Sequence, residues 1–126
     1  LLNEIGISGI KNANITKKNL KPYIDSTNEK IKLLNKAINE SQDKIHDRII
    51  YTLVLRIRTL LIIRRLKENK STKNSELIKI INNISKDAYN RYLEVKMEKM
   101  EKMVISKKEA NNLLNYLKKQ LKRLKT

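Results

Sequence analysis

The side chains that most often carry enzyme chemistry are scarce in this chain of 126 residues. It has no Cys and a single His, His46, so thiolate metal sites and cysteine nucleophiles are excluded, and an imidazole metal site lacks ligands. Helical ribonucleases that pair Arg with His on one helix place the Arg first, whereas Arg48 follows His46 here. We therefore expect His46 to be an ordinary surface or helix-start residue, and we expect neither a metal nor a cofactor.

The carboxylates and the glycines also argue against catalysis. The 13 Asp and Glu residues include no Asp-x-Asp pair of the kind that holds catalytic Mg²⁺ in nucleotide transfer. Two glycines, Gly6 and Gly9, cannot supply a glycine-rich loop through which the backbone approaches a phosphate. We expect a protein that is not an enzyme.

Basic side chains, in contrast, are abundant. The chain has 29 Lys and Arg against 13 Asp and Glu, which gives a formal net charge of +16. Such an excess is typical of proteins that neutralise an extended polyanion, although codon bias in an AT-rich genome would also raise the lysine content. With five Tyr and no Trp or Phe, we expect contacts to the nucleic-acid backbone rather than base stacking.

Two groups of cations could form a nucleic-acid-binding site. The first lies near the C-terminus, opposite a stripe of leucines, and consists of Lys118, Lys119, Lys122, Arg123 and Lys125. The run contains no acid, and it is either a binding face or a solvated helix face. The second group lies between two apolar faces of one helix and consists of Arg56, Arg58 and Arg65.

The second group has two interpretations. In one, these arginines bury their stems and pair with carboxylates such as Asp47, Asp87 or Glu94. It predicts that Arg58→Ala lowers stability by leaving a carboxylate unpaired. In the other, Arg56 and Arg58 open onto a groove and bind phosphate through two parallel hydrogen bonds.

The elements that must position these cations are all helical. After Lys18 apolar residues recur every three or four positions, and no alternating pattern typical of strands is present. The sequence predicts an all-α, single-domain bundle of about four to five helices over residues 19–126, after an irregular arm or linker over residues 1–18. We expect helices over 19–40 and 41–68, a loop over 67–75, and further helices that begin at Ser75, Ser85 and Ser106.

Local signals refine these boundaries. Pro22 suits a first helical turn, and Ser41 is predicted to cap the second helix. Ser106 and Glu109 form a capping box at the start of the last helix, and the repeat over residues 97–103 indicates a helix end near Val104. The apolar run over residues 49–66 contains four arginines, and no signal peptide is visible, so we expect a soluble cytoplasmic protein.

Three segments carry a family resemblance: Leu55–Leu60, Ala88–Lys96 and Ile105–Ala110. Their order resembles, over roughly residues 51–124, the helical, HEPN-like C-terminal domain that follows the catalytic domain in some archaeal minimal nucleotidyltransferases. The resemblance implies an α-bundle, often dimeric, that presents a substrate for nucleotidyl transfer. It also implies a substrate-binding set at Arg56, Arg58, Tyr89, Tyr92 and Lys96. The Gly-Ser element and paired aspartates of the catalytic domain do not occur here, so that active site would lie upstream or on another chain.

Three functions remain open. The first is a non-catalytic accessory module that binds nucleic acid or a nucleotide-bearing substrate beside a separate catalytic domain; since the chain starts with Leu, we expect it to be a fragment or a processed product. The second is a scaffold subunit of a replication or repair assembly. The third is a coat-type or chromatin-type protein that covers duplex nucleic acid. The second predicted helix is apolar on two sides, so we also expect a homodimer or a protein partner.

Overall fold

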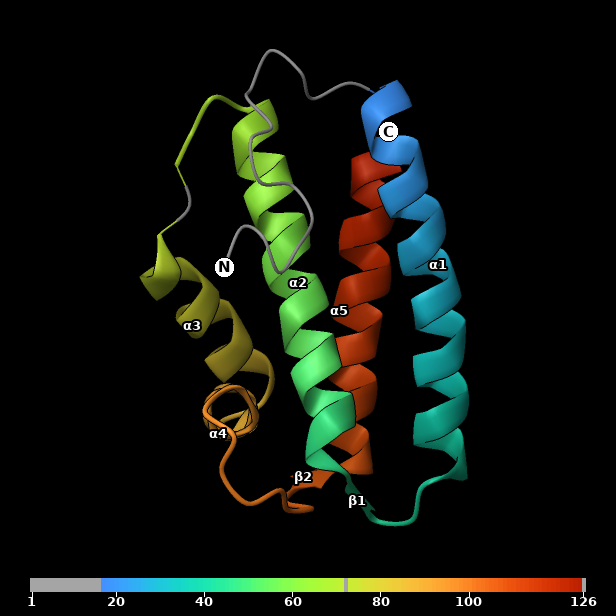
Figure 1. The fold of residues 1–126 in the computed structure, drawn as a ribbon, viewed down its shortest axis with the longest axis vertical. Coiled ribbons are helices and arrows are strands. Elements are labelled where there is room, and N and C mark those ends of the chain that lie inside the picture. The colour runs from blue at the N-terminus through green and yellow to red at the C-terminus, as the bar shows by residue number, and fades with distance from the viewer. Residues whose placement is uncertain (1–16, 72, 126) are drawn as a thin grey trace.

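Five helices and one pair of short strands make up residues 17–71 and 73–125, the part of the chain described by this computed structural model (Figure 1). Three long helices lie side by side: α1 (Lys17–Glu40), α2 (Asp47–Lys67) and α5 (Lys107–Lys125). Two shorter helices, α3 (Asn74–Ile84) and α4 (Ala88–Lys96), lie on the side of α2 away from α1. The prediction of an all-α bundle is confirmed, and the predicted arm falls largely on residues 1–16, outside the described residues.

The core follows the predicted apolar stripes. α5 buries Leu113, Leu117 and Leu121, and α1 buries Leu34 and Ile38 against it. α2 contacts α5 and α1 on one side and α4 on the other, so its buried residues face in both directions: Ile50, Leu53, Val54, Ile57, Leu60, Leu61 and Ile63. A helix that is apolar on two sides needs a cover on both, and α4 supplies the second.

The start of α2 differs from the prediction. A strand, β1 (Lys44–Ile45), pairs antiparallel with β2 (Ile105–Ser106), and α2 begins only after it, at Asp47. Ile45, in this extended segment, is completely buried. A strand of two residues is too short to show an alternating pattern in the sequence. Ser41 therefore does not cap α2: its hydroxyl donates to the carbonyl of Ala37, 2.7 Å away, and closes the end of α1.

Other helix ends are also shifted. Pro22 lies five residues after Lys17 and so falls beyond the first turn of α1. Ser85 follows α3 instead of opening α4, and its hydroxyl donates to Glu109. Ser106 caps α5 as predicted, since the Glu109 N–H donates to its hydroxyl over 3.1 Å, and the hydroxyl in turn donates to the Glu109 carboxylate.

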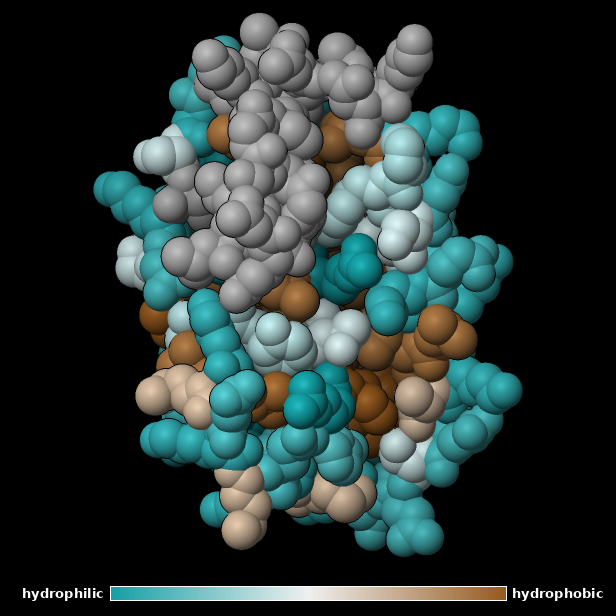
Figure 2. Space-filling view, viewed as in Figure 1, coloured by the Kyte–Doolittle hydropathy of each residue, from teal (hydrophilic) through white to brown (hydrophobic). Residues whose placement is uncertain are grey.

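The methionine-rich segment lies outside the helices. α4 ends at Lys96, well before the predicted end near Val104, and the chain continues as a loop to β2. In this loop Met97, Met100 and Met103 are 63%, 79% and 54% exposed. Figure 2 shows that hydrophilic side chains cover most of one face of the molecule, with small apolar patches between them. In the described part of the chain, every helix is too short or too polar to cross a bilayer.

Candidate functional site

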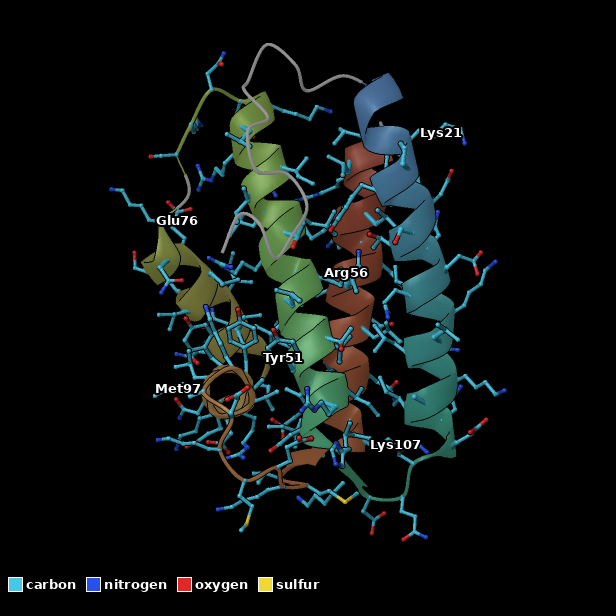
Figure 3. All side chains as sticks on the ribbon, viewed as in Figure 1. Lys21, Tyr51, Arg56, Glu76, Met97 and Lys107 are labelled. Atoms are coloured by element: carbon cyan, nitrogen blue, oxygen red, sulfur yellow. The ribbon has the colours of Figure 1, made fainter. Side chains whose placement is uncertain are left out.

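Arg56 lies in the interface between α2 and α1 (Figure 3). Its Nη1 donates to the hydroxyl of the buried Thr27 over 3.2 Å, and its guanidinium carbon lies 5.8 Å from the ring centre of Tyr23. Burial raises the pKa of Tyr23, and the neighbouring Thr27 and Arg56 oppose that rise. Arg56 thus joins two helices through a hydroxyl and an aromatic ring. The prediction that it pairs with a carboxylate is wrong.

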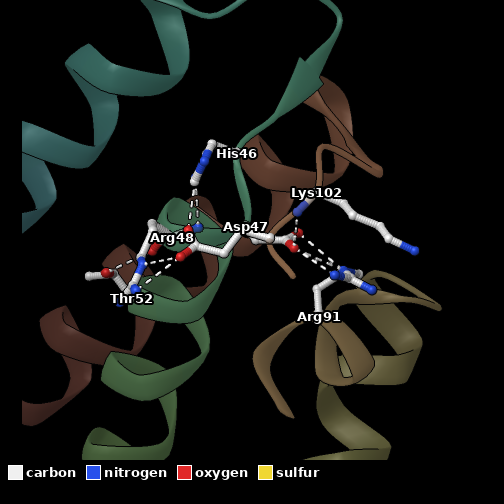
Figure 4. A network of polar contacts seen from close by, with 7 residues as sticks. His46, Asp47, Arg48, Thr52, Arg91 and Lys102 are labelled. Carbon is white, nitrogen blue, oxygen red and sulfur yellow. Dashed lines mark hydrogen bonds and ion pairs between the residues drawn. The ribbon is translucent and has the colours of Figure 1, made fainter. Parts of the chain in front are cut away.

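The carboxylate predicted to pair with an α2 arginine binds an arginine of α4 (Figure 4). Asp47 is completely buried, and Arg91 reaches it with Nε 3.1 Å from Oδ1 and Nη2 2.6 Å from Oδ2. The backbone N–H of Lys102 donates to the same Oδ2 over 2.6 Å. Arg65 pairs with Glu76 of α3, and the ion-pair partner of Glu94 is Lys99. Arg65 thus has a carboxylate partner, as the first interpretation predicted, although the acid is Glu76 rather than Asp47, Asp87 or Glu94.

Asp47 is charged in this environment. Burial raises the pKa of its carboxyl, but the hydrogen bonds from Arg91 and from the Lys102 N–H outweigh that rise and hold the pKa below its usual value. The same hydrogen bond from Arg91 raises the pKa of its guanidinium. The pair is structural, because it ties α4 and the loop after it to the start of α2.

Arg58 lies on the side of α2 opposite to Arg56. It lines a pocket of ≈ 350 Å³ between α2, α3 and α4. We call this the Arg58 pocket; its lining is Arg58, Ile62, Asn74, Leu77, Tyr89, Tyr92, Leu93 and Lys96. Among the described residues, the lining contains two cations and no acid. One nitrogen of Arg58, Nη1, is buried and has no hydrogen-bond partner. Arg58 therefore lacks the carboxylate that the first interpretation required.

Aromatic rings form one wall of the Arg58 pocket. The ring of Tyr92 stacks on that of Tyr51 with centroids 5.2 Å apart, and the Tyr89 ring lies 5.7 Å from it. The ammonium of Lys96 is 6.0 Å from the Tyr92 ring centre, a cation–π distance. The Asn74 amide donates to the Tyr89 hydroxyl over 3.3 Å.

Four of the five residues implied by the family resemblance thus meet in one pocket: Arg58, Tyr89, Tyr92 and Lys96. Arg56 faces the other way, into α1. The sequence analysis missed Tyr51 and Asn74. Tyr51 lies seven residues before Arg58 on the same helical face, which was a usable signal. Asn74 falls in the segment that was predicted as a loop, and nothing in that segment marked it.

The C-terminal cations are all exposed, but they form two stripes on α5. At about 100° per residue, Lys118, Lys122 and Lys125 share one side. This is the side of α1, because the Lys125 ammonium lies 3.4 Å from the Asn28 side-chain oxygen. Lys119 and Arg123 share the other side. The predicted single basic face is therefore divided.

One member of the second stripe, Arg123, lies near cations of α2, whereas Lys119 lines a separate hollow with Asn83 and Ile84 of α3. Arg123 lines a hollow of ≈ 180 Å³ whose other polar residues are Arg64, Lys67, Glu68 and Gln120; we call it the basic hollow. Arg64 donates to the Gln120 oxygen over 3.1 Å and lies 3.8 Å from Glu68. The sequence analysis did not assign Arg64 or Lys67 to a site. α2 and α5 run in the same direction, so their last turns lie at one end of the bundle (Figure 1).

Comparisons with protein-family models, with curated proteins and with solved structures gave no significant match. A functional argument therefore rests on the sites themselves.

His46 has a structural position. Its Nδ1 accepts a hydrogen bond from the Arg48 N–H over 3.1 Å and caps α2, while Glu101 lies 3.7 Å from the same nitrogen. The described residues contain no cluster of three or more His, Asp or Glu side chains that could hold a metal ion. The chemistry that this arrangement offers is the binding of anions, at the basic hollow and in the Arg58 pocket.

Proposed function

We propose that this chain is a non-catalytic basic helical module that binds nucleic acid through the phosphate backbone. The observation that carries the proposal is the convergence of cations from two helices at one end of the bundle. Arg64 and Lys67 of α2 line the basic hollow with Arg123 of α5, and Glu68 is the only acid that the described part of the chain contributes to its lining. Cations spaced over two helices can contact successive phosphates of a nucleic acid. A single stripe of cations on one helix is less well placed to make several such contacts.

The distribution of ion pairs supports α5 as a binding surface for phosphates. Several exposed lysines of α1 are neutralised by acids on their own helix, as in the pairs Lys21–Asp25 and Lys36–Glu40. On α5, Lys118, Lys119 and Lys122 form no ion pair within the described part of the chain. These cations remain available for an external anion. The resemblance to the helical domain of minimal nucleotidyltransferases supports the same class of ligand, with any catalytic domain upstream or on another chain.

Binding is expected to be salt-sensitive and largely independent of base sequence. Each phosphate contact releases condensed counterions, so log affinity falls against log salt with a slope of about −0.9 per contact for duplex DNA. Fluorescence anisotropy at two salt concentrations measures the slope, with single strands and duplexes of unrelated sequence as ligands. A preference for duplex would favour a coat-type or chromatin-type role. Absence of binding at low salt would remove the proposal.

A protein partner is a second proposal, and the methionine loop favours it. Three methionines are exposed along residues 97–103, and flexible thioether side chains are common at protein-binding surfaces. In this role the chain would be a scaffold subunit of a larger assembly or a homodimer. We expect light scattering at high concentration to give a mass above 14.8 kDa, and replacement of all three methionines by Gln to restore the monomer. A monomer at every concentration, with no binding of a hydrophobic dye, would contradict homodimer formation.

A further inference from the structure

We propose that the Arg58 pocket binds the terminal phosphate group of a phosphate monoester. This site is separate from the basic hollow, because the two share no lining residue. Binding at the Arg58 pocket can therefore be tested independently of the binding of the nucleic-acid backbone by α5.

Arg58 provides the first argument. Its Nη1 is buried without a hydrogen-bond partner, although a guanidinium presents five N–H donors. A buried, unsatisfied donor on a charged group is unfavourable, and proteins normally remove it with a carboxylate or a water. Among the described residues no acid lines this pocket, so an external anion is the group that would satisfy it.

The second argument is the presence of a second cation. Lys96 lines the same pocket, and its ammonium faces the Tyr92 ring at 6.0 Å and forms no ion pair within the described residues. Two cations in one cavity repel each other unless a counter-charge lies between them. A phosphate monoester carries a charge of about −1.5 to −2 at neutral pH, which matches the two cations.

The neutral residues of the pocket define the rest of the ligand. The Tyr89 hydroxyl accepts from Asn74, which leaves its own proton free to donate to a phosphate oxygen. Ile62, Leu77 and Leu93 supply apolar walls, and the tyrosine rings supply a flat one. The volume of ≈ 350 Å³ falls in the range of small-molecule pockets, about 300–1,000 Å³. The pocket thus has room for an organic group attached to the phosphate, such as a nucleoside.

Isothermal titration calorimetry with adenosine monophosphate, adenosine and inorganic phosphate tests the site. We expect the monophosphate to bind, phosphate to bind more weakly and adenosine not to bind. Lys96→Gln should reduce affinity for the monophosphate at least tenfold, and Arg58→Gln more. Lys79→Gln is the matched control, since Lys79 is an exposed lysine of α3 outside the pocket. The Lys79→Gln variant should bind the monophosphate as tightly as the parent does.

Arg58→Gln could also act through folding, so Lys96→Gln is the decisive variant because Lys96 is exposed. Thermal melting identifies a variant that fails to fold. No heat from monophosphate or phosphate at millimolar concentration would overturn the proposal, as would unchanged affinity in the folded Lys96→Gln variant.

Two sources could supply the phosphate, a free nucleotide or the phosphorylated end of a nucleic acid. Short oligonucleotides with and without a 5′-phosphate distinguish them at a salt concentration that suppresses backbone binding. A gain in affinity from the 5′-phosphate that Lys96→Gln abolishes indicates the nucleic-acid end, and binding of the mononucleotide alone indicates the free nucleotide. Substitution of Lys118, Lys119, Lys122 and Arg123 by Gln should leave binding of the monophosphate unchanged, and its loss there would overturn the claim of a separate site.

Discussion

Replacing Arg91 by Met is expected to lower the free energy of unfolding by about 3–5 kcal/mol, the usual cost of breaking a buried ion pair from one side. The carboxylate of Asp47 is completely buried, and Arg91 donates to it from Nε to both oxygens and from Nη2 to Oδ2. Without the guanidinium, the carboxylate keeps only the Lys102 N–H as a donor, and it must stay charged without an ion-pair partner or take up a proton. Urea denaturation followed by circular dichroism measures the loss.

Two further variants separate this effect from a general loss of charge. Arg48→Met removes a cation from an exposed ion pair with Glu101 and should change stability little. Adding Asp47→Asn to Arg91→Met removes both charges and keeps an acceptor for the Lys102 N–H, so the double variant should be more stable than Arg91→Met alone. An Arg91→Met protein as stable as the parent would contradict the ion pair.

The same pair predicts a dependence on pH. The pKa of Asp47 is lower in the folded protein than in the unfolded chain, where it is about 3.9. As the pH falls below that unfolded pKa, the unfolded chain takes up the proton more readily than the folded protein does. The stabilisation is therefore complete above that value and is lost as the pH falls through the folded pKa. The parent should lose stability more steeply below about pH 4 than the double variant does.

The second large effect concerns nucleic-acid binding. Replacing Lys118, Lys119, Lys122 and Arg123 by Gln should reduce the salt slope by up to about 3.6, at roughly 0.9 for each of four phosphate contacts. Relative to 1 M salt, a slope change of about 3.6 corresponds at 0.1 M salt to a loss of affinity of up to about 4,000-fold, similar for all base sequences. Folding should be preserved because all four side chains are exposed. Anisotropy titrations measure the affinity and its salt slope, and thermal melting measures the stability of the fold.

The division of these cations into two stripes sharpens this experiment. The pair Lys119→Gln and Arg123→Gln should weaken binding more than the pair Lys118→Gln and Lys122→Gln, because Arg123 lies beside Arg64 and Lys67 at the basic hollow. A control with the same loss of charge replaces four exposed lysines elsewhere, Lys44, Lys79, Lys86 and Lys108. If the control loses as much affinity as the quadruple variant, net charge alone drives binding and the basic hollow is no interface.

Periodicity was enough to predict the long elements. The leucines of α5 and the two apolar sides of α2 recur at helical spacing. The α5 leucines and one side of α2 are buried, and the residues of the other side of α2 pack against the core partly buried. The β1–β2 pair could not be predicted, because two residues per strand are fewer than any alternating pattern requires. Its consequence was the misplaced start of α2.

The partners of the arginines were beyond the sequence for a different reason. The pattern shows that Arg56, Arg58 and Arg65 lie between apolar faces, but it does not show which acid reaches which guanidinium. Asp47 binds Arg91, which lies 44 residues further along the chain. The substitution expected to be costly thus moves from Arg58 to Arg91. Arg58 was left without an acid, and that made it a candidate for ligand binding.

The position of the Arg58 pocket between two ion pairs affects how the molecule opens. α3 is joined to α2 by the pair Arg65–Glu76, and α4 is joined to the start of α2 by Arg91–Asp47. α1, α2 and α5 form a frame that is packed together independently of these pairs. Opening of the α3–α4 layer would break both ion pairs and expose the side of α2 that α4 covers, so we expect the backbone amides of the layer to exchange with solvent hydrogen together. A ligand that joins Arg58 of the frame to Lys96 of the layer would slow that exchange without touching either ion pair.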